Sequence, residues 1–271
     1  MLETEKVALA ATLLLEETNP PERKFNKGRE AGVDETEVRN NFSGAVYYFK
    51  KINGIWTYVG IITNSNGTAN QQFGHGVAIS QDGSKAVIGA AADSPGGVNG
   101  IGSCYYYVRT GDVWSEVSKI PSPEPEVRSY FGSSTGLNSN GDVFVVGAYG
   151  KDDIGVDSGA IYVFTRTNNT WSLEGKITPD GLSATDRLGL WLSMNSVGDV
   201  VVARGRFFNP EGVRTYAYLI LKKVNGVWTT VNTFGSDDSR PSINTENTYL
   251  ISGNPDAAGN APSSGVIVIY Q

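Results

Sequence analysis

Short apolar runs, separated by glycine and asparagine turns, repeat along the chain. The clearest turns are Asp82-Gly83, Asn140-Gly141 and Asn225-Gly226. An Asx-Gly pair between two apolar runs is the strongest short-range signal for a β-hairpin. The pattern therefore predicts short antiparallel strands joined by tight turns.

Four tryptophans, Trp56, Trp114, Trp171 and Trp228, follow one another at intervals of 58, 57 and 57 residues. A fixed period of this size indicates an array of one structural unit. Each copy divides into a run of small apolar residues, a β-branched run, an aromatic run and a tryptophan run. We therefore expect each unit to be a four-stranded antiparallel meander, with its tryptophan packed at the outer edge or between units.

Repeated four-stranded meanders arranged radially form a β-propeller. The fold class is therefore all-β, a propeller of about five four-stranded blades in a single domain over residues 1–271. The repeats are expected at residues 5–66, 73–125, 131–181, 188–234 and 235–271. The first and last copies each lack one strand, and the two do not complete each other, so part of a six- or seven-bladed propeller is the alternative.

The motif Phe-Gly…Gly-Ala…Ser-Gly-Ala-Ile-Tyr-Val-Phe, seen at Phe131-Gly132, Gly147-Ala148 and 158–164, resembles the FG-GAP repeat. That repeat builds the propeller of the integrin α subunit head and of many surface proteins. The resemblance implies a cell-adhesion or protein-binding role outside the cell. It leaves the compartment of this chain, and the identity of any partner, unknown.

Composition excludes several classes of function. A net charge of −6 gives no general attraction to nucleic acid or to an anionic membrane, and no run of residues approaches the roughly 20 apolar positions that span a bilayer. Cys104 is the only cysteine, so no intrachain disulfide can form. It aligns with Ala45 and Ala160, which predicts a small packing residue at the start of an aromatic strand.

The first unit departs from the others in two places. Residues 6–11 stand where its β-branched strand belongs, although alanine and leucine there also favour helix. Residues 16–41 form a longer, charged loop. Long loops on a rigid scaffold often carry binding function, but mixed-charge polar sequence is equally typical of disorder.

The most informative candidates are positions where the repeat is broken. Trp191 and Arg240 replace glycine or serine of other copies, and Arg204 replaces glycine. An arginine beside an aromatic ring can stack on a sugar or bind a carboxylate. Plugging of a narrow channel is the alternative for these three residues. His75, the only histidine, is a fourth candidate on a strand that would line the channel, where a purely structural role is the alternative.

Metal binding has one candidate in this sequence. The turns at residues 80–84, 138–142 and 195–199 contain too few carboxylates for a calcium loop of the Asp-x-Asp-x-Asp-Gly type. Asp152, Asp153 and Asp157 form the only local carboxylate cluster. We expect no cofactor, with calcium at these three residues as the alternative to a solvated loop.

These observations predict a non-enzymatic module that presents loops to a protein or glycan partner at a cell or particle surface, either alone or in a larger assembly. Two alternatives are a glycosidase-like enzyme and a sugar-binding lectin. A glycosidase needs carboxylates on the inner strands, and the aligned positions there carry none. A multivalent lectin needs the same pocket in several blades, and Trp191 and Arg240 are not repeated.

Overall fold

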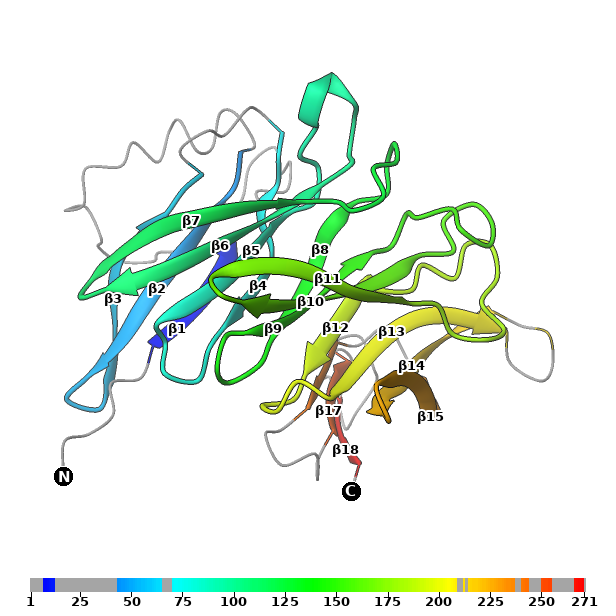
Figure 1. Cartoon of the computed structure of the whole chain (residues 1–271). Helices are drawn as coiled ribbons and strands as arrows, with labels where there is room; N and C mark the ends of the chain where they lie inside the picture. Colours follow the sequence, from blue (N-terminus) through cyan, green and yellow to red (C-terminus); the bar gives the residue numbers. More distant parts are fainter. Residues whose placement is uncertain are drawn as a thin grey trace, which may run out of the picture.

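The computed structural model describes residues 7–12, 43–64, 70–208, 212, 214–236, 240–243, 250–254 and 266–270. These residues form 18 strands in five antiparallel sheets (Figure 1). We number the sheets one to five in chain order. The predicted loop at residues 16–41 lies outside the described residues.

Sheets two and three are regular four-stranded meanders. Sheet two comprises β4 (Phe73–Ile79), β5 (Lys85–Ala90), β6 (Ser103–Thr110) and β7 (Val113–Pro121). Sheet three comprises β8 (Phe131–Leu137), β9 (Val143–Ala148), β10 (Ala160–Thr167) and β11 (Thr170–Ile177). A short 3₁₀ element, η1 (Pro95–Gly97), lies in the loop after β5.

Sheet four has the same strand order, with a shorter first strand and three longer strands after it. It comprises β12 (Trp191–Met194), β13 (Val200–Phe208), β14 (Arg214–Val224) and β15 (Val227–Ser236). Its β13–β14 ladder continues to the Phe208–Arg214 pair, whereas the β9–β10 ladder of sheet three ends at Ala148–Ala160.

The first and last sheets have three strands each. Sheet one comprises β1 (Val7–Thr12), β2 (Ala45–Ile52) and β3 (Ile55–Ile62). Sheet five comprises β16 (Arg240–Ile243), β17 (Leu250–Asn254) and β18 (Val266–Tyr270). Residues 7–12 pair with β2 as a strand, so the helical alternative for this segment is wrong.

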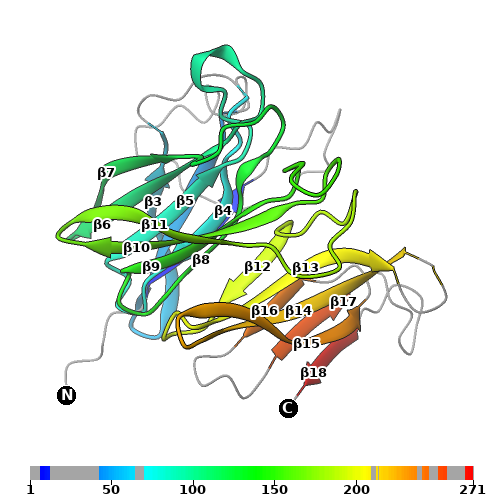
Figure 2. The same ribbon diagram turned by 45° about the vertical axis from the view of Figure 1, so that its right-hand side comes forward.

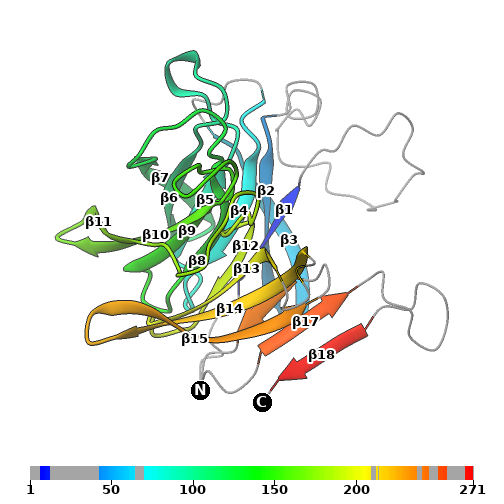
Figure 3. The same ribbon diagram turned by 90° about the vertical axis from the view of Figure 1, so that its right-hand side faces the viewer.

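The sheets follow one another like the blades of a propeller (Figure 2). In Figure 3 the strands β1, β4, β8 and β12 lie toward the centre, while β7, β11 and β15 lie at the periphery. Contacts join β1 to β4, β4 to β8, β8 to β12 and β12 to β16. The fold is thus an all-β propeller in which the first strand of each full sheet lies nearest the axis.

The core lies between consecutive sheets rather than inside one of them. One apolar cluster joins Val87, Cys104 and Tyr106 of sheet two to Phe131 and Phe144 of sheet three. A second joins sheet three to sheet four. Sheet three therefore buries its two faces against two neighbours, which is how a blade without a core of its own becomes stable.

Three of the four periodic tryptophans pack against the preceding sheet. Trp114 meets the Tyr48 ring edge-on at 6.1 Å between ring centroids, and Trp171 meets Tyr106 at 5.3 Å. Trp228 packs on the cluster that contains Val163 of sheet three. Trp56 belongs to the first sheet in the chain and is 49% exposed. The periodic positions therefore serve packing between sheets.

The Phe-Gly motif forms the closest contacts between sheets. The inner strands of sheets two and three begin at the motif, at Phe73 and Phe131, several residues earlier than the apolar pattern indicates. A Cβ on Gly89 would lie 1.9 Å from the Gly132 carbonyl oxygen, and a Cβ on Gly147 would lie 1.9 Å from that of Gly189. Backbone therefore meets backbone at these points, where only glycine fits.

The sequence alignment of Cys104 is wrong by one residue. Cys104 pairs with Gly89 in the ladder, just as Ile161 pairs with Gly147. Its equivalent in sheet three is therefore Ile161 and not Ala160. The thiol is fully buried, and this burial raises its pKa well above the usual range.

Candidate functional site

Two ends of the propeller carry the connections. We call the end at which β4, β8 and β12 begin the FG end, after the Phe-Gly motif, and the opposite end, with the tight hairpin turns, the turn end. The FG end holds the loops at residues 91–102, 122–130, 149–159 and 178–190. Three of the four candidate ligand-binding residues, His75, Trp191 and Arg240, lie at or near the FG end of their strands, whereas Arg204 lies in the middle of β13.

Trp191 and Arg204 are brought together by sheet four. They face each other in the β12–β13 ladder, at the positions held by Ser134 and Gly147 in sheet three. Trp191 is partly buried, and Arg204 is only 2% exposed. The Arg204 guanidinium carbon lies 3.9 Å from the centre of the Tyr216 ring, a close cation–π contact. Its burial leaves little of Arg204 for a ligand to reach.

The other two candidates lie on the inner strands of different sheets. Arg240 begins β16 and faces Gly253 of β17. In His75, the Nδ1 atom lies 2.6 Å from the carbonyl oxygen of Ser133 on β8. The neighbouring serines also bind backbone, because the Ser134 hydroxyl donates to the Gly189 carbonyl at 2.6 Å. These contacts join the inner strands of consecutive sheets.

The three aspartates proposed as calcium ligands each bind different partners in the protein. Asp153 pairs with Lys176 at 2.6 Å and with Lys151 at 3.2 Å. Asp157 pairs with Arg187 at 3.0 Å, and Asp152 accepts the backbone N–H of Asp157 at 2.7 Å. In the described part of the chain, no three metal-ligating side chains of the His, Cys, Asp or Glu type gather at one point.

Lys151 is the centre of this ionic network at the FG end. Its ammonium group is nearly buried and also binds Glu126, while Lys176 binds Glu124 at 2.8 Å. Burial opposes the charge of Lys151, but its hydrogen bonds to Glu126 and Asp153 raise its pKa above the usual value. The carboxylates therefore neutralise two lysines and fasten the loop at residues 122–130 to the loop at 149–159.

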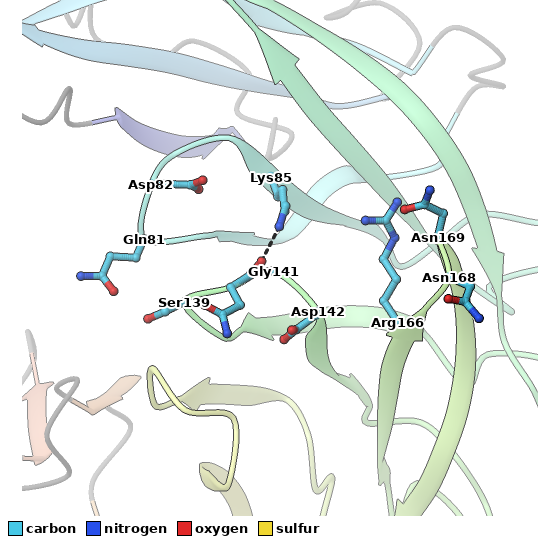
Figure 4. A pocket seen from close by; sticks show the side chains of 10 residues that line it. Gln81, Asp82, Lys85, Ser139, Gly141, Asp142, Arg166, Asn168 and Asn169 are labelled. Carbon is cyan, nitrogen blue, oxygen red and sulfur yellow. Dashed lines mark hydrogen bonds between the residues drawn. The ribbon is translucent and has the colours of Figure 1, made fainter.

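The turn end contains a polar pocket between sheets two and three (Figure 4). Its lining residues are Gln81, Asp82, Lys85, Ser139, Asn140, Gly141, Asp142, Arg166, Asn168 and Asn169. In Figure 4, Lys85 reaches across to the Asn140 carbonyl group, with Arg166, Asn168 and Asn169 along one side.

The acidic side chains at this pocket are already used by their own turns. Asp82 accepts from the Ser80 hydroxyl at 2.5 Å and from the Ser84 backbone N–H at 3.0 Å. The Asn138 amide donates to Asp142 at 2.7 Å, and its oxygen accepts two backbone N–H groups of the same turn. The pocket is thus lined by side chains that hold hairpin turns in place.

One group at the FG end was missed by sequence reasoning. The rings of Tyr130 and Tyr149 stack with centroids 4.9 Å apart and an interplanar angle of 11°, and both tyrosines are partly exposed. They lie in connections, outside the strand pattern that guided the search. Their repeat positions would have revealed them, because sheet two has Gln72 and Ala91 at these places.

Comparison with known protein families agrees with the repeat. The family model described as FG-GAP repeat matches residues 56–107 and 114–164. Each match starts at a periodic tryptophan, on the last strand of one sheet, and ends on the third strand of the next. This protein is therefore a β-propeller that contains FG-GAP repeats.

Similar solved structures are also propeller proteins of low sequence identity. TolB from Acinetobacter baumannii has a TM-score of 0.48 and 15% identity, covering 84% of this chain and 46% of that one. The periplasmic gluconolactonase PpgL from Pseudomonas aeruginosa has a TM-score of 0.42 and 9% identity, covering 76% and 71%. The chain thus spans about half the length of the first of these. Among curated proteins, no sequence matches this chain.

No helix in the part of the chain that the structure describes has the length and apolar character needed to cross a membrane.

Proposed function

We propose that this propeller is a non-enzymatic binding module that presents its FG end to a protein or glycan partner at an extracellular or otherwise exposed surface. The observation that carries the proposal is the surface of three consecutive FG-end loops. They expose the apolar side chains of Val98, Val127, Ile154 and Val156, with exposed fractions of 39%, 57%, 56% and 65%. Exposed apolar residues beside charged ones are typical of interaction sites.

The loops that carry these residues are held rigidly by backbone hydrogen bonds. Arg128, Tyr130 and Phe131 donate their N–H groups to the carbonyls of Asn99, Gly100 and Ile101, at 2.9–3.1 Å. The next junction repeats this arrangement between residues 185–188 and residues 156–158. A surface that is ordered before binding loses less conformational entropy when the partner docks. These loops are therefore suited to recognition without rearrangement.

The proposal is tested by screening the whole chain on a glycan array and against purified surface proteins. We expect saturable binding to a defined glycan or protein, without chemical change of that ligand. A variant with Val127 and Ile154 both changed to serine should bind at least 10-fold more weakly, whereas Val113→Ser with Val227→Ser, at exposed turn-end positions, should bind normally.

Two results would overturn the proposal. The absence of binding in both screens would leave the propeller with an architectural role only. Turnover of an arrayed glycan would instead support the glycosidase-like alternative.

A further inference from the structure

Two stacked tyrosines and two arginines gather at the FG end of sheet three. Tyr130 precedes β8 and Tyr149 follows β9, and the N–H of Gly150 donates to the Ser129 carbonyl at 3.2 Å, which holds the two segments together. The Tyr130 ring lies against Gly100 and Gly150, where an added Cβ would come within 3.0–3.1 Å of it. The Tyr130 ring therefore packs against the backbone of two glycines, and this packing fixes its position.

The charged members of this group come from both neighbouring junctions. Arg128 lies two residues before Tyr130 and is exposed, and a hydrogen bond with Tyr130 raises its pKa. Arg187 comes from the connection to sheet four and pairs with Asp157 at 3.0 Å. We call Arg128, Tyr130, Tyr149, Arg187 and Asp157 the Arg–Tyr cluster. Its formal charge is +1 on a chain of net charge −6.

The pKa of Tyr149 shows that the members of the cluster lie within range of one another. Burial, together with Tyr130 and Asp157, raises this pKa to about 12, although Arg187 and Arg128 act in the opposite direction. Tyr149 is therefore a neutral ring at physiological pH. Because the Tyr149 ring is partly buried, its electrostatic interaction with the guanidinium groups of Arg128 and Arg187 is stronger than it would be in water.

The fold does not require these side chains. The connection before β4 has the same left-handed backbone as the connection before β8, with φ of 64° at Asn70 and 62° at Arg128. Asparagine tolerates this conformation better than arginine does. Arginine at this position therefore costs some stability without improving the turn. The tyrosine pair has Gln72 and Ala91 as its equivalents in sheet two, which forms the same strands without a pair of rings at this place.

We propose that the Arg–Tyr cluster binds a carboxylate-bearing sugar residue of an acidic glycan. A pyranose ring presents C–H groups that pack on an aromatic face, and its carboxylate accepts hydrogen bonds from guanidinium groups. Arginine binds a carboxylate with two parallel hydrogen bonds, which fixes the orientation of the sugar as well as its charge. This inference rests on the proposed binding function, and it names the ligand class and the site.

The test is isothermal titration of the full chain with a trimer of galacturonic acid. The methyl ester of the same trimer serves as its uncharged twin. We expect the acid to bind and the ester to bind at least 10-fold more weakly. Arg128→Gln and Arg187→Gln should each weaken binding of the acid by about 10-fold. Lys222→Gln, which removes one exposed positive charge at the turn end, should bind like the wild type.

Tyr149→Leu tests the contribution of the aromatic ring independently, because it removes the ring without changing the charge of the site. It should weaken both trimers, provided that its unfolding midpoint remains close to that of the wild type. If this variant fails to fold, Arg128→Gln alone still decides, since the Arg128 side chain is exposed.

Three outcomes overturn the inference. The first is failure of the wild type to bind the acidic trimer. The second is an equal loss in Lys222→Gln, which would indicate diffuse attraction. The third is tighter binding of an oligoglutamate peptide with the same dependence on Arg128, which would assign the site to protein. If a ligand from the array binds normally to Arg128→Gln and Arg187→Gln, the binding function stands and only this site fails.

Discussion

Sheets three and four share one strand order but meet the next unit in different ways. In sheet three, Gly147 and Gly159 touch the backbone of the following Leu188-Gly189 motif. In sheet four, Arg204 and Tyr216 stand at the equivalent positions, and the following unit has Asp237-Asp238 where the motif belongs. The glycines are thus needed only where a Phe-Gly type motif follows them.

Sheet four, which has Arg204 and Tyr216 in place of the two glycines, also differs from sheet three in shape. The β13–β14 ladder continues to Phe208–Arg214, whereas the β9–β10 ladder stops at Ala148–Ala160. Arg206 adds a second cation near the Tyr216 ring, 5.1 Å from its centre. Each repeat position is therefore defined by the neighbouring unit as much as by its own sheet.

The largest effect is expected for Gly89→Ala in sheet two, which tests whether glycine is needed where two sheets meet through their backbones. The new Cβ would overlap the Gly132 carbonyl oxygen, and both atoms belong to backbone that cannot move freely. We expect a loss of about 4 kcal/mol or failure to fold, at the upper end of overpacking effects. Urea unfolding followed by tryptophan fluorescence measures this loss.

Gly175→Ala is the matched control, because no atom lies within 4 Å of its added Cβ. Its free energy of unfolding should change by less than about 0.5 kcal/mol. Equal stability of the two variants would show that the sheets are not in backbone contact.

The next largest effect is expected at the periodic tryptophans. Trp171→Ala removes edge contacts with Tyr106 of the preceding sheet and with Phe144 of its own. We expect a loss of about 3 kcal/mol, as for other large-to-small changes in packed structure. Trp56→Ala should cost less than about 1 kcal/mol, because Trp56 is 49% exposed. Similar costs at both positions would contradict packing between sheets as the cause of the period.

Sheet four is probed through the contact between Arg204 and Tyr216. Arg204→Met keeps most of the side-chain volume but removes the cation, and we expect a loss of about 2 kcal/mol for a buried cation–π pair. A double-mutant cycle with Tyr216→Leu isolates the coupling, which should be about 1–2 kcal/mol. Additive effects of the two substitutions would mean that the stacked geometry contributes nothing of its own.

The sequence predicted the strands and sheets well, because their signals are local. Asx-Gly turns and the tryptophan period depend on residues within one unit, and they place the strands correctly in sheets two and three. The early start of β4 and β8 at Phe73 and Phe131 could not be predicted from periodicity. There the backbone is extended because it meets the preceding sheet, a contact far away in sequence.

The candidate site was harder to predict for the same reason. Trp191 and Arg204 were identified by their departure from the repeat, but the burial of Arg204 depends on Tyr216 and on the extended β13–β14 ladder. Tyr130 and Tyr149 meet only because two connections are held side by side by backbone hydrogen bonds. Departure from the repeat therefore locates unusual residues, and only the fold shows which of them meet.

The smallest expected effect concerns pH and compares the two ionic groups of the FG end. In sheet two, Asp93 is 2% exposed and pairs with Lys119 at 2.7 Å, whereas the Lys151 network of sheet three shares its charge among three carboxylates. Burial alone would raise the pKa of Asp93, but the hydrogen bond and the charge of Lys119 oppose this effect, and the pKa is lowered below its usual value. The group therefore stabilises the fold above its unfolded pKa, and this contribution is lost as the pH falls through the lowered folded value.

Asp93→Asn should cost about 1 kcal/mol at pH 7, and this deficit should shrink as the pH falls below the unfolded pKa of Asp93, because the contribution of its charge is then progressively lost. Urea unfolding at pH 7, 5 and 3 measures the difference, with Asp180→Asn on an exposed loop as the control. A deficit that stays constant over this range would show that the Asp93–Lys119 pair contributes through packing rather than through charge. In that case sheets two and three would differ in the number of their ionic contacts but not in their response to acid.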